Sequence, residues 1–216
     1  MERRLRLVAF DMDGVLTNAR NSWTALHDHF GTNNEHSLRQ FIRDEIDDHE
    51  FIRRDVALWT GRRGRVRLAE VHEALAPMHA SDDAMQITAF LKKRGIKIVI
   101  ITGGVDFFAE RIGREIGADR FYSNGLEVDG DGYLTGKGIV GVPLKSKDRI
   151  LRRVRDELCI DRDECVSIGD SFIDVPMFNE SRFGIAVRPL DEQVRNAARY
   201  CVRDLIEAME ILKPLI

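Results

Sequence analysis

Two aspartates follow a short apolar segment near the start of the chain. Residues 7–10 read Leu-Val-Ala-Phe, and Asp11 and Asp13 come directly after them, with Gly14 next. In an open α/β sheet, residues just past the carboxyl end of a strand line the ligand crevice, so both carboxylates are expected in one site. Two carboxylates so close raise each other's pKa, which makes the pair unfavourable without a cation. The pattern indicates a metal site, although Asp and Gly also favour an ordinary turn.

A hydroxyl and two glycines end a second apolar run. Thr102, Gly103 and Gly104 follow residues 96–101. Glycines let backbone amides approach an anion closely, the threonine adds a donor, and the N-terminus of a following helix favours negative charge. These residues are typical of a phosphate-binding turn, and a strand-to-helix turn that needs glycine for its backbone is the alternative.

Acidic residues recur after a third apolar run, residues 165–168. Asp170 follows that run and Asp174 comes one turn later. If a helix begins near Asp174, then Asp170 faces the same crevice, while Asp174 caps the helix or reaches a metal-bound water. Upstream, Lys145 and Lys147 open a helical segment. One of them suits a solvated helix face, and the other can neutralise a phosphate bound between the acids.

The elements that must position these residues form a parallel sheet. Four runs are rich in Val and Ile, at residues 7–10, 96–101, 165–168 and 183–187. They lack the alternation of apolar and polar residues that a strand with one solvent-exposed face shows, so they predict strands buried on both faces. Helical periodicity between them, at residues 82–94, 107–116 and 147–158, supplies the crossovers. The predicted fold class is α/β, with a doubly wound, Rossmann-like sheet.

One stretch lacks any buried strand. Residues 18–80 show helical patterning only, around residues 37–46 and 66–78. They predict a small helical cap inserted into a core domain that comprises residues 1–17 and 81–216. A hairpin is expected at residues 126–135, where alternating residues flank an Asp-Gly-Asp-Gly turn.

Composition narrows the class of partner. Lys and Arg (33) nearly balance Asp and Glu (36) among 216 residues, so net charge gives no reason to expect nucleic acid. The apolar segment at the start is too short for a signal peptide or a membrane span. The three cysteines have no metal-site spacing and fit a reducing compartment. We expect a cytoplasmic monomer or homodimer with no nucleic-acid or membrane partner.

Together, the motifs at Asp11, Thr102, Lys147 and Asp170 resemble, in one order, the four motifs of the haloacid dehalogenase superfamily. The resemblance covers residues 1–17 and 81 to about 190, and the inserted cap looks like that superfamily's first (C1) cap class. The Thr-Gly-Gly motif and the segment 122–136 are similar to the phosphoserine phosphatase-like branch.

This resemblance implies a Mg²⁺-dependent phosphomonoester hydrolase that acts on a small phosphorylated metabolite through an aspartyl-phosphate on Asp11. Mg²⁺ would bind the Asp11 and Asp170 carboxylates and the main-chain carbonyl of Asp13. Asp13 would also serve as general acid and base.

The remaining motif residues would bind the phosphoryl group. Thr102 and Gly103 would hold its oxygens, and Lys147 would neutralise it. Lys147 is preferred to Lys145 because the run from Lys147 to Leu151 matches the family's Lys-x-x-Ile-Leu spacing. Asp174 would hold Lys147 and a metal-bound water.

Three positions depart from the phosphoserine phosphatase pattern. Arg20 replaces the Glu that meets the substrate's amino group, residues 51–59 offer no clear match for the cap Arg, and Ile173 replaces an Asn. Arg pairs bidentately with carboxylates and phosphates, so Arg20 suggests a substrate with extra negative charge. The alternative is that Arg20 faces solvent at the cap hinge.

Two other activities remain open. A phosphotransferase or mutase of the same superfamily would pass the phosphoryl group to a second alcohol instead of water. A non-catalytic phospho-acceptor regulatory module also becomes phosphorylated on an Asp at a strand end, but it would have no need of Asp13 or of a cap.

Overall fold

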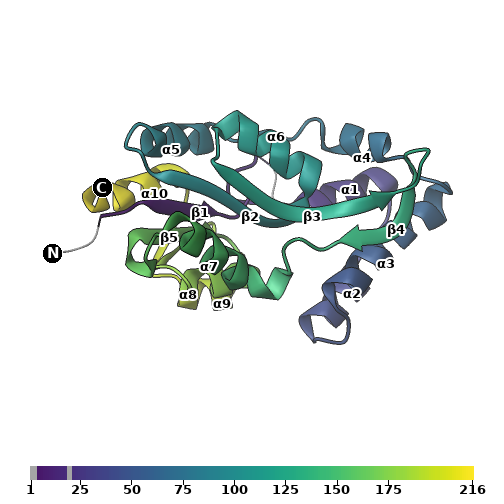
Figure 1. Ribbon diagram of the computed structural model, residues 1–216. Coiled ribbons are helices and arrows are strands. Elements are labelled where there is room, and N and C mark those ends of the chain that lie inside the picture. Colours follow the sequence, from purple (N-terminus) through teal and green to yellow (C-terminus); the bar gives the residue numbers. More distant parts are fainter. Residues whose placement is uncertain (1–3, 19–20) are drawn as a thin grey trace.

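A seven-stranded sheet forms the centre of the molecule, in the order β4-β3-β2-β1-β5-β6-β7 (Figure 1). The computed structural model describes residues 4–18 and 21–216, so Arg20 lies outside the described residues. All neighbouring strands pair in parallel except β3 and β4. The strands are β1 (Leu7–Phe10), β2 (Lys97–Val105), β3 (Arg120–Val128), β4 (Leu134–Ile139), β5 (Cys165–Gly169), β6 (Gly184–Val187) and β7 (Tyr200–Val202).

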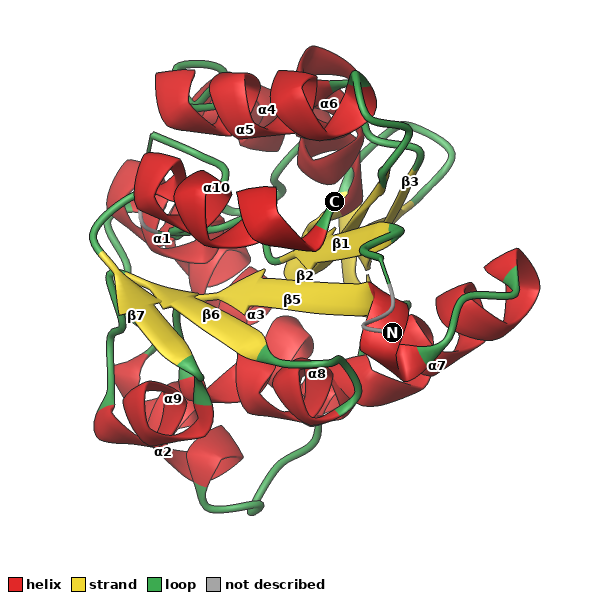
Figure 2. Cartoon of the chain, turned by 90° about the vertical axis from the view of Figure 1, so that its left-hand side faces the viewer, coloured by secondary structure: helices red, strands yellow, loops and turns green. Residues whose placement is uncertain are grey.

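Helices cover both faces of the sheet, with α5, α6 and α10 on one side and α7, α8 and α9 on the other (Figure 2). Alternate residues of β1 enter the two cores, Val8 and Phe10 into one and Leu7 and Ala9 into the other, as the pleat of a strand requires. The predicted doubly wound α/β fold is confirmed. These helices are α5 (Asp82–Lys92), α6 (Asp106–Ile116), α7 (Lys147–Leu158), α8 (Val175–Asn179), α9 (Glu192–Ala197) and α10 (Leu205–Leu212).

The four apolar runs all form strands, whereas β3, β4 and β7 had no comparable apolar run. β3 has only a short buried stretch and β7 is a three-residue edge strand. The hairpin of β3 and β4 forms where expected, because Asp129 accepts hydrogen bonds from the amides of Asp131 (3.0 Å) and Tyr133 (2.9 Å) in its turn. β2 continues through the two glycines to Val105, and α6 begins directly after it at Asp106, one residue before the predicted start.

Between β1 and α5 the described residues form four helices, α1 (Ser22–Phe30), α2 (Glu35–Ile42), α3 (Asp48–Arg63) and α4 (Leu68–Leu75). We call residues 21–80 the helical insert. Asn21 caps α1 by accepting from the amide of Thr24 (3.0 Å), and Asp47 caps α3 in the same way. The predicted helix over residues 37–46 ends early, at Ile42, before a left-handed residue at Asp44 (φ 60°).

The insert joins the core through two adjacent connections. Thr17 and Ala80 form an isolated antiparallel bridge, and the amide of Ser81 donates to the carbonyl of Leu16 (2.9 Å). A second contact lies farther along the insert, where Ile52 of α3 packs against the backbone of Gly138 in β4. The division into a core of residues 1–17 and 81–216 and a cap of residues 18–80 stays a prediction. Within the described residues, every helix is too short or too polar to cross a membrane.

Candidate active site

Three adjacent strands bring the predicted acids and the threonine to one edge of the sheet. β1 lies between β2 and β5, so Asp11 stands between Thr102 and Asp170 at the carboxyl ends of these strands. All three side chains are at least 95% buried. The amide of Asp11 donates to the carbonyl of Ile168 (2.9 Å), which extends the β1–β5 ladder to the first motif residue. Gly14 then turns the chain with a positive φ of 70°, which glycine adopts without strain.

Lys147, at the start of α7, lies between two carboxylates. Its Nζ atom is 2.8 Å from Oδ1 of Asp11 and 2.6 Å from Oδ1 of Asp174, and its side chain is fully buried. The other oxygen of Asp174 accepts from the amides of Asp170 (2.9 Å) and Ser171 (3.2 Å). Asp174 therefore uses both oxygens to hold Lys147 and the loop that carries Asp170. Lys145 lies apart from this group.

The charges in this cluster are strongly coupled. Burial raises the pKa of Asp11 to about 7, although Lys147 beside it acts in the opposite direction. Burial, together with the charges of Asp11 and Asp174, raises the pKa of Asp170 to about 9. Burial alone would lower the pKa of Lys147, but the two carboxylates that it contacts raise it. One lysine does not balance three buried carboxylates, so the cluster requires a further cation before all three can ionise together.

The residues present fit a divalent metal ion. Carboxylate oxygens of Asp11, Asp170 and Asp174 lie within 4.8 Å of one another. Because Asp174 already has partners for both oxygens, Asp11 and Asp170 are the carboxylates left to hold the ion. Such hard oxygen ligands suit Mg²⁺ or a similar cation.

Asp13 lies beside the cluster with a different environment. Its Oδ2 accepts a hydrogen bond from the hydroxyl of Ser22 (2.6 Å), and its Oδ1 is buried with no hydrogen-bond partner. Burial raises the pKa of Asp13 to about 6, although the hydrogen bonds from Ser22 lower it. A carboxyl group with a pKa near neutrality can both give and take a proton at working pH. Ser22 carried no signal in the sequence.

The Thr-Gly-Gly segment lies where the pairing of β2 with β3 shifts register, between Ile101 and Val105. The hydroxyl oxygen of Thr102 accepts from the amide of Gly104 (3.0 Å), so its own proton remains available to a ligand. The carbonyl of Gly103 accepts from Trp23 Nε1 (3.1 Å) and from the side-chain amide of Asn124 (3.4 Å). A Cβ atom on Gly104 would lie 2.6 Å from Met12 Cε, so the buried Met12 side chain would have to shift to admit a larger residue.

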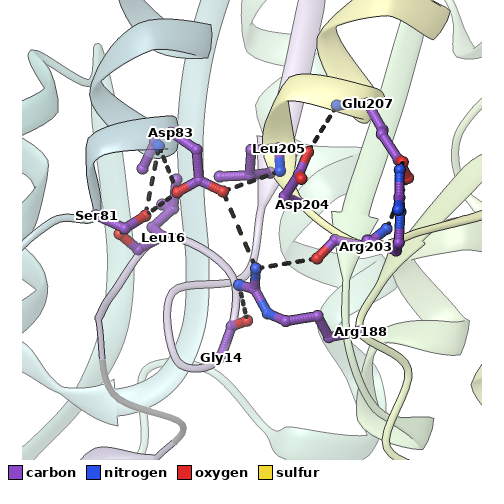
Figure 3. Close-up of polar contacts among 10 residues, drawn as sticks. Gly14, Leu16, Ser81, Asp83, Arg188, Arg203, Asp204, Leu205 and Glu207 are labelled. Carbon is purple, nitrogen blue, oxygen red and sulfur yellow. Dashed lines mark hydrogen bonds and ion pairs between the residues drawn. The ribbon is translucent and has the colours of Figure 1, made fainter.

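Arg188 anchors the loop that carries the aspartates (Figure 3). Its guanidinium donates to the carbonyl of Gly14 (2.8 Å) and to the carbonyl of Arg203 (3.4 Å), and it lies 4.0 Å from Oδ2 of Asp83. The same oxygen of Asp83 accepts from the amide of Leu205 (3.0 Å). The loop after Asp13 is thereby tied to the first turns of α5 and α10.

A cavity of about 270 Å³ lies between the core and the helical insert. At the core end it is lined by Asp11, Asp13, Thr102, Gly103 and Asp170. At the insert end it is lined by aromatic and aliphatic side chains and by two aspartates: Trp23, Leu38, Phe41, Phe51, Ile52, Asp48 and Asp55. Lys145 instead holds the insert from outside this cavity, since its Nζ donates to the carbonyl of Phe41 (2.8 Å) and to Asp44 (2.6 Å).

The comparison with protein families agrees with the ordered motifs. The model of the haloacid dehalogenase-like hydrolases matches residues 8–179. The chain belongs to this family. Among curated relatives, the phosphoserine phosphatase of Polaromonas sp. is 30% identical over 96% of this chain and 90% of its own length. That of Methanocaldococcus jannaschii is 26% identical over 99% of this chain and 100% of its own.

Solved structures show the same fold. A phosphoserine phosphatase in the form of a phospho-aspartyl intermediate analogue superposes with a TM-score of 0.83, at 23% identity, over 97% of this chain and 100% of its own. A substrate-bound phosphoserine phosphatase superposes with the same TM-score over 98% of this chain and 100% of its own. The predicted family, fold class and enzyme class, a phosphatase, are confirmed by these relatives.

The hydrolase motifs account for one end of the cavity only. Ser22, Asn124 and Arg188 contact motif residues, yet the sequence pattern did not single them out. The stretch 51–59, examined for a carboxylate-binding Arg, forms part of α3. It presents Asp55 to the cavity, while Arg53 and Arg54 pair with Glu50.

Proposed function

We propose that this chain hydrolyses a small phosphomonoester in two steps through an aspartyl-phosphate on Asp11. The observation that carries the proposal is the position of Lys147, which is buried between Asp11 and Asp174 at the carboxyl edge of the sheet. A fully buried lysine holds Asp11 in one orientation and offsets charge where a phosphate dianion would meet a carboxylate. An Asp-x-Asp-Gly turn with only a structural role would need neither effect.

In the first step, an oxygen of Asp11 attacks phosphorus and the bond to the substrate's alcohol oxygen breaks. Thr102 and the backbone at Gly103 bind the phosphoryl oxygens, and Lys147 neutralises part of their charge. Asp13, with a pKa of about 6, protonates the departing alcohol. In the second step, Asp13 takes a proton from water as that water attacks the phosphorus and releases Asp11.

The family is metal-dependent in general, and we propose Mg²⁺ as the ion for this chain. The carboxylates of Asp11 and Asp170 would hold it together with the main-chain carbonyl of Asp13. Mg²⁺ supplies charge neutralisation for the phosphoryl oxygens. Asp174 positions Lys147 and the Asp170 loop instead of binding the ion directly, because both of its oxygens have partners.

The substrate class follows from the cavity and the relatives. A space of about 270 Å³ fits a small phosphorylated metabolite. The curated relatives are phosphoserine phosphatases, so phosphoserine is one candidate. The role of Arg20 in binding an anionic substrate group stays a prediction.

Replacement of Asp11 by Asn, measured as phosphate release from p-nitrophenyl phosphate with Mg²⁺, tests this function. Turnover should fall below detection while the thermal unfolding midpoint shows a folded protein, and EDTA should silence the unmodified enzyme. Asp82→Asn, on the exposed first turn of α5, is the matched control and should keep full activity. Substantial activity of Asp11→Asn, or activity indifferent to EDTA, would refute the proposal.

A further inference from the structure

The insert end of the cavity contains a buried carboxylate that lacks a complete set of partners. Asp55, on α3, is 2% exposed and lines the cavity. Its Oδ2 accepts a hydrogen bond from the side-chain amide of Asn34 (3.0 Å). Its Oδ1 is buried and has no hydrogen-bond partner. A buried carboxylate is costly unless it is paired, so the cationic partner of Asp55 has to be identified.

His27 leaves Oδ1 of Asp55 without a hydrogen bond. Its Nε2 lies 3.4 Å from that oxygen, and no hydrogen bond joins the two atoms. On the other side of the ring, Nδ1 of His27 lies 3.2 Å from Nε1 of Trp59 and 2.8 Å from Oγ1 of Thr32. The hydrogen bonds of the His27 ring are therefore on the side away from Asp55.

The basic residues nearest to Asp55 on α3 pair with a different carboxylate. Arg53 and Arg54 pair with Glu50 at 2.6 Å and 2.7 Å, and neither lines the cavity. Among the described residues that line the cavity there is no Lys or Arg. A second carboxylate, Asp48, lines it instead and accepts from the amide of Leu144 (2.8 Å). The described lining residues at the insert end thus include two carboxylates and no Lys or Arg.

The surroundings of these carboxylates suit an organic cation. Phe41 and Phe51 stack on each other with ring centroids 5.1 Å apart, and both line the cavity with Trp23. The ring of Phe41 already has Nζ of Lys145 at 4.9 Å from its centroid, which leaves Phe51 and Trp23 for a ligand. Aromatic faces attract ammonium groups, and the attraction strengthens where water is excluded. The apolar side chains of Leu38 and Ile52 beside them can accept the hydrocarbon part of a ligand.

We infer that the substrate is a phosphomonoester of an amino alcohol without a carboxylate, whose ammonium group binds at Asp55 and Asp48 while its phosphate lies at Asp11. The inference rests on the proposed phosphatase function and names the substrate class for that site. It differs from the expectation drawn from Arg20, which favours an additional anionic group. The ammonium group brings a positive charge to an end of the cavity whose described lining has two carboxylates and no Lys or Arg.

Four phosphomonoesters separate these possibilities: O-phosphoethanolamine, ethyl phosphate, phosphoglycolate and O-phosphoserine. They carry an ammonium group, no extra charge, a carboxylate, and both groups. For the unmodified enzyme with Mg²⁺, kcat/KM for O-phosphoethanolamine should exceed the values for ethyl phosphate and phosphoglycolate by roughly tenfold or more, as one desolvated charge-assisted contact would produce. O-Phosphoserine should fall below O-phosphoethanolamine because its carboxylate meets Asp48 and Asp55.

Asp55→Asn locates the effect. It keeps an oxygen for Asn34 but removes the charge, so the ratio of kcat/KM for O-phosphoethanolamine to that for ethyl phosphate should fall roughly tenfold. Asp48→Asn, at a half-buried position, should lower the ratio less. Glu73→Gln, an exposed substitution on α4, is the control and should leave the ratio unchanged. Thermal unfolding confirms that each variant is folded.

Binding measured by isothermal titration to Asp11→Asn provides a readout that does not depend on turnover. Equal affinity and equal kcat/KM for O-phosphoethanolamine and ethyl phosphate would overturn the inference, as would a preference for phosphoglycolate that Arg20→Ala abolishes. If neither these esters nor p-nitrophenyl phosphate is hydrolysed, the proposed function fails. In that case the binding experiment still tests the preference for an ammonium group, because it does not depend on turnover.

Discussion

The buried carboxylates at the two ends of the cavity have different partners. At the core end, Asp11 and Asp174 share Lys147, and the backbone amides of Asp170 and Ser171 complete the partners of Asp174. At the insert end, Asp55 accepts one hydrogen bond, from Asn34, and its other oxygen lies beside His27 without a hydrogen bond. We propose that the core end carries out phosphoryl transfer and that the insert end binds the ammonium group of the ligand. Reaction and selectivity are therefore expected to respond to separate substitutions.

The largest effect on the reaction, with no effect on selectivity, is expected for Asp13→Asn. Loss of the proton donor should lower kcat for O-phosphoethanolamine and ethyl phosphate alike, by roughly 10²–10⁴-fold. p-Nitrophenyl phosphate should suffer less, because its leaving group needs no proton. Steady-state kinetics on the three esters checks this. A change in the ratio between the ammonium and neutral esters would show that the two ends are not independent.

Two lysines two positions apart give the next largest contrast. Lys147→Met should lower kcat by roughly 10²–10³-fold, because it removes the charge beside Asp11 and the phosphoryl oxygens. Lys145→Met removes contacts with Phe41 and Asp44 of the insert, and should act mainly on KM, by less than about tenfold. Kinetics of both variants on one substrate suffices. Equal losses of kcat would contradict the assignment of Lys147 to the core end.

The acidic residues at the core end should also make the stability of the protein depend on pH and on bound metal. The folded pKa values of Asp11 and Asp170, about 7 and about 9, lie above those of an unfolded chain. The folded state then binds more protons, so the metal-free protein should lose stability as pH rises from about 6 to about 8. Mg²⁺ at a hundred times its Kd should add about 2.7 kcal/mol, with a larger gain at the higher pH.

Thermal unfolding with EDTA or Mg²⁺ measures both effects. Asp170→Asn should weaken the pH dependence and the response to Mg²⁺, whereas Asp55→Asn at the insert end should leave the response to Mg²⁺ intact. Stability of the metal-free protein that increases over this range would count against the repulsion among these acids.

The smallest effect is expected at Arg188. Arg188→Met removes the hydrogen bond to the carbonyl of Gly14 and should lower kcat roughly tenfold, since a bond from a charged group contributes on the order of 1.5 kcal/mol. Arg203→Met is the matched control, because that side chain pairs with Glu207 and only its carbonyl meets Arg188. Kinetics in which Arg203→Met is as impaired as Arg188→Met would remove Arg188 from the loop's support.

The sequence predicts the core end well because one topological rule applies to it. Asp11 and Asp170 each follow a strand, Thr102 follows the apolar run of β2, and parallel strands bring such residues together. Ser22, Asn124 and Arg188 could not be found this way. Each reaches the site through packing of distant segments, such as the contact between Arg188 and Gly14, and a lone serine, asparagine or arginine has no distinctive spacing.

The insert was harder to predict for a related reason. Helix α3 buries Ile52, Asp55, Val56 and Trp59, which recur at helical spacing, but the Asp at the second position hides the apolar period. The same residue that obscured the helix carries the charge at the insert end of the cavity. Deviation from a clean amphipathic pattern thus marked a residue that faces a ligand space instead of a solvent-free core.

The most direct test of the central claim is to identify the residue that carries the phosphoryl group. The enzyme is mixed with p-nitrophenyl phosphate and Mg²⁺, quenched with acid within one turnover and treated with borohydride, which reduces an aspartyl-phosphate to homoserine. Peptide mass spectrometry then locates the change. We predict homoserine at position 11, with Asp13 and Asp170 unmodified and no product in Asp11→Asn. Homoserine at another position, or none during active turnover, would contradict the account.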